Sequence, residues 1–226
     1  MQKIKLRNLS FMRELVFGME DGMVSTLGSI TGIAVGSGNQ STVLLAGSVI
    51  IAVESISMGI GSYLSNKSEE EMNKRKIQEE REEIKKYPEE EKKELYNIYL
   101  AEGWPEDLAK NMTEVASKNE EIFLREMMNR ELNIPNEQES VSVKGGLYMF
   151  FTYIVGGLIP LSSYLLLPIK TAIPISIATT LAGLFILGIS TTKFTRQPLL
   201  KSGLRILVMG GIALVAGLVA GLLIGE

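Results

Sequence analysis

The sequence predicts an all-α membrane protein with five transmembrane helices and a cytoplasmic helical insert between helices two and three. One observation is the distribution of charge: residues 65–144 hold 21 acidic and 14 basic side chains, whereas the other 146 residues hold 5 and 9. The second is that these other residues form long apolar runs, and a helix needs about 20 apolar residues to cross a bilayer. We therefore predict three domains: residues 1–64 with two transmembrane helices, the insert 65–144, and residues 145–226 with three.

The apolar runs differ in how clearly they predict a membrane span. Four are long and almost free of charge, namely residues 43–64, 145–167, 171–192 and 204–224. The first run, residues 15–35, contains Glu20 and Asp21, so a re-entrant or interfacial segment is the alternative for it. Its glycines favour close packing inside a helical bundle, because they recur at four-residue spacing as Gly18 and Gly22, then Gly28, Gly32 and Gly36.

Basic residues predict the orientation, since Lys and Arg are enriched in cytoplasmic loops. They lie before the first span and around the loop between the fourth and fifth spans: Lys3, Lys5, Arg7, Arg13, Lys193, Arg196, Lys201 and Arg205. With five spans, this places the N-terminus and residues 65–144 in the cytoplasm and the C-terminus on the opposite side of the membrane.

The insert reads as a series of helices. Residues 65–86 are helical in composition and continue the second span; Pro88 suits the first turn of a helix through Leu100. Gly103-Trp104-Pro105 breaks that helix, and two short helices are predicted at 106–117 and 119–132. The expected core is small, so we expect support from a metal, the membrane helices or a second subunit. Its predicted members are Ile77, Ile84, Leu95, Ile98, Tyr99, Trp104, Leu108, Val115, Ile122 and Phe123.

Composition excludes several functional classes. The chain has no Cys and no His, which excludes thiol catalysis, iron–sulfur clusters, His-based triads, haem ligation and the usual zinc enzymes. Its net charge of -3 argues against nucleic-acid binding. We predict neither enzymatic activity nor a prosthetic group.

Three carboxylates in the predicted spans are candidates for cation binding. Glu20, Asp21 and Glu54 have no Lys or Arg within their own apolar runs, and an unpaired carboxylate in hydrocarbon normally faces a cavity and binds a cation or a proton. Met58 follows Glu54 by four residues, so a thioether shares its helix face, and sulfur shifts preference toward Fe²⁺ and similar ions. The alternatives are that Glu20 lies at the water interface and that Met58 only fills space.

The insert carries a second set of candidate ligands. Glu80 and Glu83 are three residues apart on one helix, as are Glu91 and Glu94 on the next, so a helical hairpin brings four carboxylates together. The last helix of the insert adds Glu126, Met127, Met128 and Glu131. Clustered carboxylates repel one another unless a polyvalent cation neutralises them. The alternative is a solvated charged face, because lysines are interleaved with the acids.

Two segments resemble the first two helices of the vacuolar iron transporter family. They are Glu14-Leu-Val-Phe-Gly18-Met-Glu-Asp21-Gly22-Met-Val-Ser-Thr26 and Ser57-Met58-Gly-Ile-Gly61-Ser-Tyr63-Leu64-Ser65. The resemblance covers essentially the whole chain. It implies a homodimer in the lipid bilayer whose first spans line the transport path, with Asp21 and Met58 as membrane metal ligands. It also implies a set of cytoplasmic ligands: Glu80, Glu83, Glu91, Glu94, Met127, Met128 and Glu131.

Three positions depart from the family pattern. Ser62 stands where a Glu is typical, Glu54 where a shorter Asp is usual, and Glu20 where a neutral polar residue is common. These changes bear on metal preference more than on transport.

We therefore predict a transporter that moves a divalent transition metal out of the cytoplasm, Fe²⁺ first, with Mn²⁺ or Zn²⁺ as further candidate ions. Moving a doubly charged ion outward against an inside-negative potential costs about 4.6 kcal/mol per 100 mV, so we expect proton antiport, as the resemblance also implies. The main alternative is a membrane-anchored metal sensor or storage module without transport. A cation channel would show no proton counterflow, and a di-iron oxidase would need Glu-x-x-His motifs that a chain without His lacks.

Overall fold

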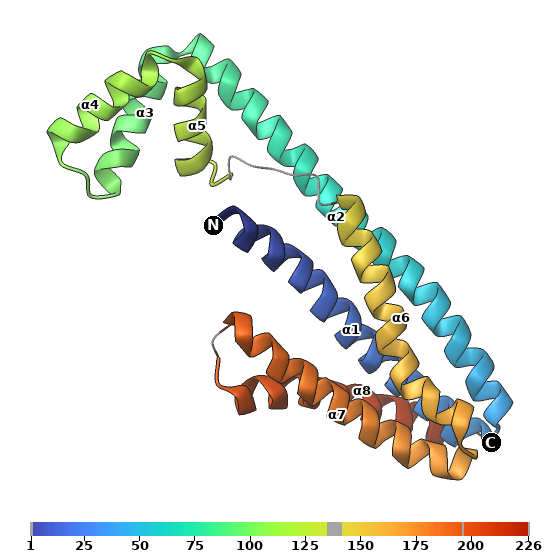
Figure 1. Cartoon of the computed structure of the whole chain (residues 1–226). Coiled ribbons are helices and arrows are strands. Elements are labelled where there is room, and N and C mark those ends of the chain that lie inside the picture. Colours follow the sequence, from blue (N-terminus) through green and yellow to red (C-terminus); the bar gives the residue numbers. More distant parts are fainter. Residues whose placement is uncertain (1, 135–141, 196, 226) are drawn as a thin grey trace. The chain divides into compact units, whose positions relative to one another are not determined.

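The computed structural model of the chain describes residues 2–134, 142–195 and 197–225. Within these ranges all regular structure is helical, which confirms the predicted all-α class. The helices are α1 (Gln2–Ser37), α2 (Gln40–Lys86), α3 (Pro88–Ala101), α4 (Glu106–Ser117), α5 (Glu120–Arg130), α6 (Ser142–Leu166), α7 (Ile169–Thr195) and α8 (Leu199–Ile224) (Figure 1). By compactness the chain divides into two units, which we call the bundle unit (Met1–Leu64 with Ser142–Glu226) and the insert unit (Ser65–Val141).

Among the described residues, four helices are long and apolar enough to cross a membrane: α2, α6, α7 and α8. They contain the four runs that the sequence analysis identified as long and almost free of charge. α1, which holds the first predicted run, is not among the four, because Glu20, Asp21 and many small polar residues lower its mean hydropathy. Length and hydropathy therefore support four of the five predicted spans.

Glycines allow α1 to approach its neighbours in the bundle unit closely. A Cβ added to Gly28 would lie 2.7 Å from the carbonyl oxygen of Ala213 in α8, and one added to Gly18 would lie 3.0 Å from that of Met149 in α6. Because these neighbours are backbone atoms, a larger side chain would force the helices apart. Small residues serve this purpose in membrane helix packing, where no hydrophobic force drives helices together.

The order of the contacts gives the direction of each helix. Successive α1 residues meet partners of rising number in α8 and α6, so these three helices are parallel; the pairs are Gly28 with Ala213, Gly32 with Gly217, Gly36 with Gly221, Gly18 with Met149 and Gly22 with Tyr153. α2 runs opposite to α6, and α7 runs opposite to α8; the pairs are Gly47 with Leu161, Gly59 with Gly146, Gly188 with Gly203 and Gly210 with Leu184. The helix direction in the bundle unit thus alternates along the chain.

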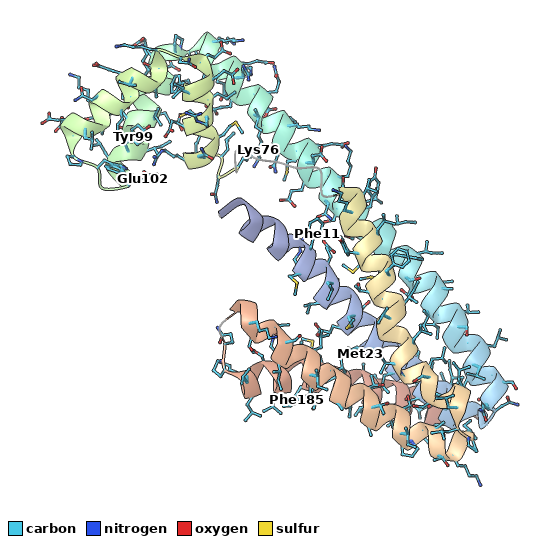
Figure 2. All side chains as sticks on the ribbon, viewed as in Figure 1. Phe11, Met23, Lys76, Tyr99, Glu102 and Phe185 are labelled. Atoms are coloured by element: carbon cyan, nitrogen blue, oxygen red, sulfur yellow. The ribbon has the colours of Figure 1, made fainter. Side chains whose placement is uncertain are left out.

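The apolar interior of the bundle unit forms around the same helices. Met23 of α1 is 1% exposed and belongs to one buried cluster with Leu184 of α7 and Ile206 of α8 (Figure 2). Ile30 belongs to a second buried cluster that includes Tyr164 of α6. The α1 helix therefore contributes side chains to both buried clusters of the bundle unit.

The helices predicted for the insert are confirmed, and each helix begins and ends within two residues of the predicted position. α2 continues to Lys86 without a break, Pro88 occupies the first turn of α3, and α5 is capped by Asn119. The Asn119 Oδ1 accepts hydrogen bonds from the backbone N–H groups of Glu121 at 3.0 Å and Ile122 at 3.1 Å.

The predicted core of the insert was partly wrong. Leu95, Tyr99 and Phe123 are buried as expected, together with residues not predicted: Ala109, Ala116, Leu124 and Met127. Trp104, Leu108 and Val115 are instead 41%, 41% and 63% exposed. For Leu108 and Val115 the reason is that α4 turns a different face inward, which carries the small residues Ala109, Thr113 and Ala116. Trp104 precedes α4, and its Nε1 donates a hydrogen bond to Glu102 Oε2 at 3.1 Å.

The glycine contacts lead to a stability prediction. Gly217→Ala is expected to lower the melting temperature of the detergent-solubilised protein by about 3 °C or more, because the new Cβ would collide with the carbonyl oxygen of Gly28. Gly211→Ala is the matched control, since a Cβ at this position of the same helix meets nothing within 4 Å. Equal melting temperatures for the two variants would contradict the packing described here.

Candidate metal-binding sites

Asp21 and Glu54 lie close together in the bundle unit, near enough for their charges to interact. The helices that carry them are antiparallel: Ser62 Oγ of α2 donates a hydrogen bond to Glu14 Oε2 of α1 at 3.0 Å, whereas Gly47 lies against Ile30. Between these two contacts, the register brings Glu54 level with Asp21. Asp21 is half-buried and Glu54 is exposed.

Met58 lies on the same face of α2 as Glu54, one helical turn nearer to the contact between Glu14 and Ser62. One turn corresponds to about 6 Å along the axis. Its side chain is partly buried, which leaves room for a ligand at the sulfur. The predicted pair of Met58 and Glu54 therefore shares one helix face, with Asp21 opposite the carboxylate.

Tyr153 of α6 was missed by the sequence analysis. It is fully buried, its hydroxyl lies 2.6 Å from Ser25 Oγ, and the charges of Asp21 and Glu54 both act on it. A tyrosine in an apolar helix carries no sequence signal that distinguishes it from a packing residue. Only the register of α6 against α1 brings its hydroxyl to the acids.

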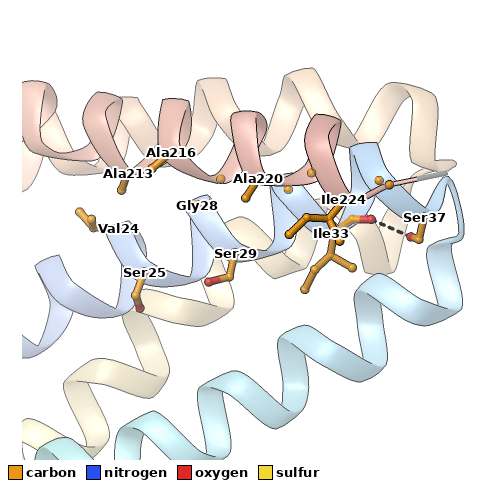
Figure 3. Close-up of a pocket in the computed structure, with 15 residues that line it drawn as sticks. Val24, Ser25, Gly28, Ser29, Ile33, Ser37, Ala213, Ala216, Ala220 and Ile224 are labelled. Carbon is orange, nitrogen blue, oxygen red and sulfur yellow. Dashed lines mark hydrogen bonds between the residues drawn. The ribbon is translucent and has the colours of Figure 1, made fainter.

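A groove of about 850 Å³ runs between α1 and α8 in the bundle unit (Figure 3). Small residues of both helices line it, and three serines of α1 give it a polar strip: Ser25, Ser29 and Ser37. Ser25 and Ser29 follow Asp21 at four-residue spacing and so share its face of α1. The groove thus continues the line of polar side chains that begins at Asp21.

The insert unit brings the predicted glutamates together. Glu80 of α2 is 3% exposed, and its Oε1 has no hydrogen-bond partner among the described residues. Burial, together with the negative charges of Glu131 and Glu91, raises the pKa of Glu80 to about 8. Glu80 therefore holds a proton at neutral pH unless a cation takes its place.

The charges of Glu83, Glu91 and Glu131 act on Glu80, and the charge of Glu94 acts on Glu91 and Glu131. Burial and the charge of Glu94 raise the pKa of Glu91, and the same two causes, in the same order, raise the pKa of Glu131. A cavity of about 370 Å³ lies beside these glutamates, and its lining residues are Lys76, Glu79, Glu80, Glu83, Glu131 and Leu132. Lys76 is labelled in Figure 2. The negative charges of the five predicted glutamates therefore repel one another, and a bound cation would relieve that repulsion.

The cluster is not closed around a single point. Among the described residues, no three acidic side chains are placed as bound ligands of one metal ion would be. Met127 is fully buried in the apolar core of the insert, and Met128 packs partly buried against that core. The structure therefore groups the carboxylates, while the two methionines lie in or beside the core.

Glu126 belongs to a different network, although the sequence analysis grouped it with Glu131. Its Oε2 accepts hydrogen bonds from Tyr99 at 3.1 Å and from Arg130 Nε at 2.9 Å. Arg130 also pairs with Glu102 and lies over the Tyr99 ring, 4.7 Å from its centroid. Glu126 is neutralised by a permanent cation and braces α5 against α3.

The raised pKa values lead to a pH prediction for the metal-free protein. The folded insert holds protons that the unfolded chain releases above pH 4.5, so the free energy of unfolding is expected to fall as pH rises from about 5 to 8. Urea unfolding of the full chain with a chelator, followed by the fluorescence of Trp104, the single Trp, measures this.

Glu80→Gln is expected to flatten this pH dependence, because it removes the titrating carboxyl. Glu114→Gln, an exposed acid of α4, is the control and should keep the wild-type slope. A wild-type midpoint that does not move between pH 5 and 8 would contradict the cluster.

Comparisons with known proteins identify the family of the chain. The model of the VIT family matches residues 12–222. "Vacuolar iron transporter 1" of Arabidopsis thaliana is 32% identical over 89% of this chain and 81% of its own length, and that of Tulipa gesneriana is 31% identical over 89% and 82%. "Vacuolar iron transporter" of Plasmodium falciparum (isolate 3D7) is 29% identical over 89% and 78%. The chain is therefore an integral membrane protein that belongs to the vacuolar iron transporter (VIT) family, a family of transporters and not of enzymes.

Proposed function

We propose that this protein carries divalent transition-metal ions, Fe²⁺ first and Mn²⁺ second, out of the cytoplasm in exchange for protons. The observation that carries the proposal is the pairing of Asp21 with Glu54 between two membrane helices, with no basic residue in either apolar run. Two carboxylates that face each other in a low dielectric bind a divalent cation or protons in its place. The names of the relatives, vacuolar iron transporters, support iron as the ion.

Five membrane crossings are part of this proposal. α1 packs lengthwise against α6 and α8, two helices long and apolar enough to span a membrane, and it is parallel to both. The alternation of direction through α1, α2, α6, α7 and α8 is what five successive crossings produce. The distribution of Lys and Arg then supports a cytoplasmic N-terminus, a cytoplasmic insert unit and an opposite C-terminus.

The insert unit is proposed to collect the ion before transport. Glu80, Glu91 and Glu131 have raised pKa values because they are buried and repel one another, and a divalent cation relieves that repulsion. Glu83 and Glu94 complete the carboxylate set, and Met127 and Met128 are the proposed soft donors. Oxygen donors with sulfur favour Fe²⁺ over Mg²⁺ and Ca²⁺.

The path through the membrane is proposed to lie at an interface between two copies of the chain. Glu54 is exposed on the single protomer, on a helix whose neighbours Val53 and Ile56 are 59% and 53% exposed. A carboxylate facing lipid is costly, so a second copy is the proposed cover. The groove along α1 is lined by Ser25 and Ser29 (Figure 3). Their hydroxyl oxygens are proposed to continue the path from Asp21 toward the side of the membrane opposite the cytoplasm.

Transport is tested with the full chain reconstituted into liposomes that enclose a pH-sensitive dye. Fe²⁺, Mn²⁺ and Zn²⁺ are supplied outside under imposed proton gradients, and metal entry is expected to be coupled to proton exit. Asp21→Asn and Glu54→Gln are each expected to lower the initial rate by at least about tenfold, because each removes a proposed ligand. Glu69→Gln, an exposed acid farther along α2, is the control and should keep the wild-type rate.

Other outcomes of this experiment identify the alternatives. Metal binding without flux under any gradient would overturn the proposal in favour of a sensor or storage module. Flux down the metal gradient without proton counterflow would indicate a channel. Wild-type rates in Asp21→Asn would remove Asp21 from the path.

Metal binding by the insert is tested by titrating Mn²⁺ into the purified full chain. Glu91→Gln and Glu131→Gln are each expected to weaken binding by about tenfold, since each removes a carboxylate from the cluster. Glu114→Gln is again the control. Unchanged affinity in both cluster variants would show that the ion binds elsewhere.

A further inference from the structure

The adjacent acids Glu20 and Asp21 of α1 face different helices. The charge of Asp21 interacts with Glu54 of α2, whereas the charge of Glu20 interacts with Arg205 of α8 as well as with Asp21. Consecutive residues of a helix point about 100° apart, so Asp21 can face Glu54 of α2 while Glu20 faces α8. The sequence analysis treated these acids alike, because Arg205 is remote in the chain.

The packing register supports the pairing of Glu20 with Arg205. Each α1 glycine meets the α8 residue that lies 185 positions later; the pairs are Gly28 with Ala213, Gly32 with Gly217 and Gly36 with Gly221. Because the helices are parallel, the same offset carried two turns back from Gly28 places Arg205 level with Glu20. Glu20 is half-buried and Arg205 is exposed, and the positive charge of Arg205 acts on Glu20.

We propose that Arg205 is the permanent counter-ion of Glu20. A guanidinium does not lose its proton in proteins, so it neutralises Glu20 at every pH at which transport occurs. This pairing holds α8 against α1 and prevents Glu20 from competing with Asp21 and Glu54 for the ion. Arg205 is thus a positioning residue. Its role in transport rests on the proposed function, whereas the ion pair itself does not.

If Glu20 and Arg205 are paired, the two single variants leave uncompensated charges of opposite sign. Arg205→Gln leaves Glu20 as an additional carboxylate beside Asp21, which should hold the metal longer and lower both KM and kcat. Glu20→Gln leaves an unpaired cation beside the path, which should repel the metal and raise KM. The double variant E20Q/R205Q removes both charges and should restore both parameters toward wild type. Removing one partner leaves the charge of the other uncompensated, whereas removing both leaves no uncompensated charge.

The first readout is stability and needs no transport. Melting temperatures of the detergent-solubilised full chain are measured for wild type, both single variants, the double variant and Lys201→Gln, an exposed cation one turn earlier in α8. Each single variant is expected to melt about 3 °C lower than wild type, and the double variant is expected to recover most of that loss. The proposed pair would be overturned if the double variant lost as much melting temperature as the two single variants together. It would also be overturned if Arg205→Gln melted at the same temperature as Lys201→Gln.

The second readout is the split of KM and kcat for Mn²⁺ transport in the liposome assay. The expected pattern is a lower KM in Arg205→Gln, a higher KM in Glu20→Gln and near wild-type values in the double variant. Equal shifts in both single variants would overturn the role of Arg205 in transport. If wild type carries no metal, the proposed function fails, while the melting temperatures still decide the ion pair.

Discussion

The structure depends on the close backbone contact of α1 with α6 and α8. In lipid, helices are not driven together by the hydrophobic effect, so a helix with two adjacent acids stays in a bundle only if its backbone packs tightly. Gly28 and Gly18 provide that contact, and a side chain at either position would meet a carbonyl oxygen of the neighbouring helix. The same contact sets the register that brings Tyr153 of α6 to Ser25 of α1.

The acids of this chain fall into two groups according to their partners. Glu126 is held by Tyr99 and Arg130, and Glu14 accepts hydrogen bonds from Ser62 and Arg13, so these acids are part of the framework. Burial and like charges instead surround Glu80, which is therefore poised to exchange a proton for a cation. A basic or hydroxyl partner thus separates structural carboxylates from those available to an ion.

The open arrangement of the insert cluster suits a transporter. The described carboxylates interact electrostatically without closing around one point, so the ion of the proposed function would draw them together on binding. Part of the binding free energy is then used for that rearrangement, which limits affinity and favours release. A site closed in advance would hold the ion more tightly and pass it on more slowly, a property expected of storage.

The sequence by itself determined the helical class, four apolar spans, the helices of the insert and the charge contrast between them, because periodicity, proline and hydropathy are local properties. It also pointed to Asp21, Glu54, Glu80 and Glu91, since unpaired acids in apolar or crowded surroundings are visible in a linear pattern. Only the tertiary structure decided three other features. Glu126 belongs to a different network from Glu131, and Leu108 and Val115 face outward. Tyr153 and Arg205 interact with the acids of α1 although they are far from them in the chain. Each of these depends on which helix faces meet, and that is set by packing between residues far apart in the chain.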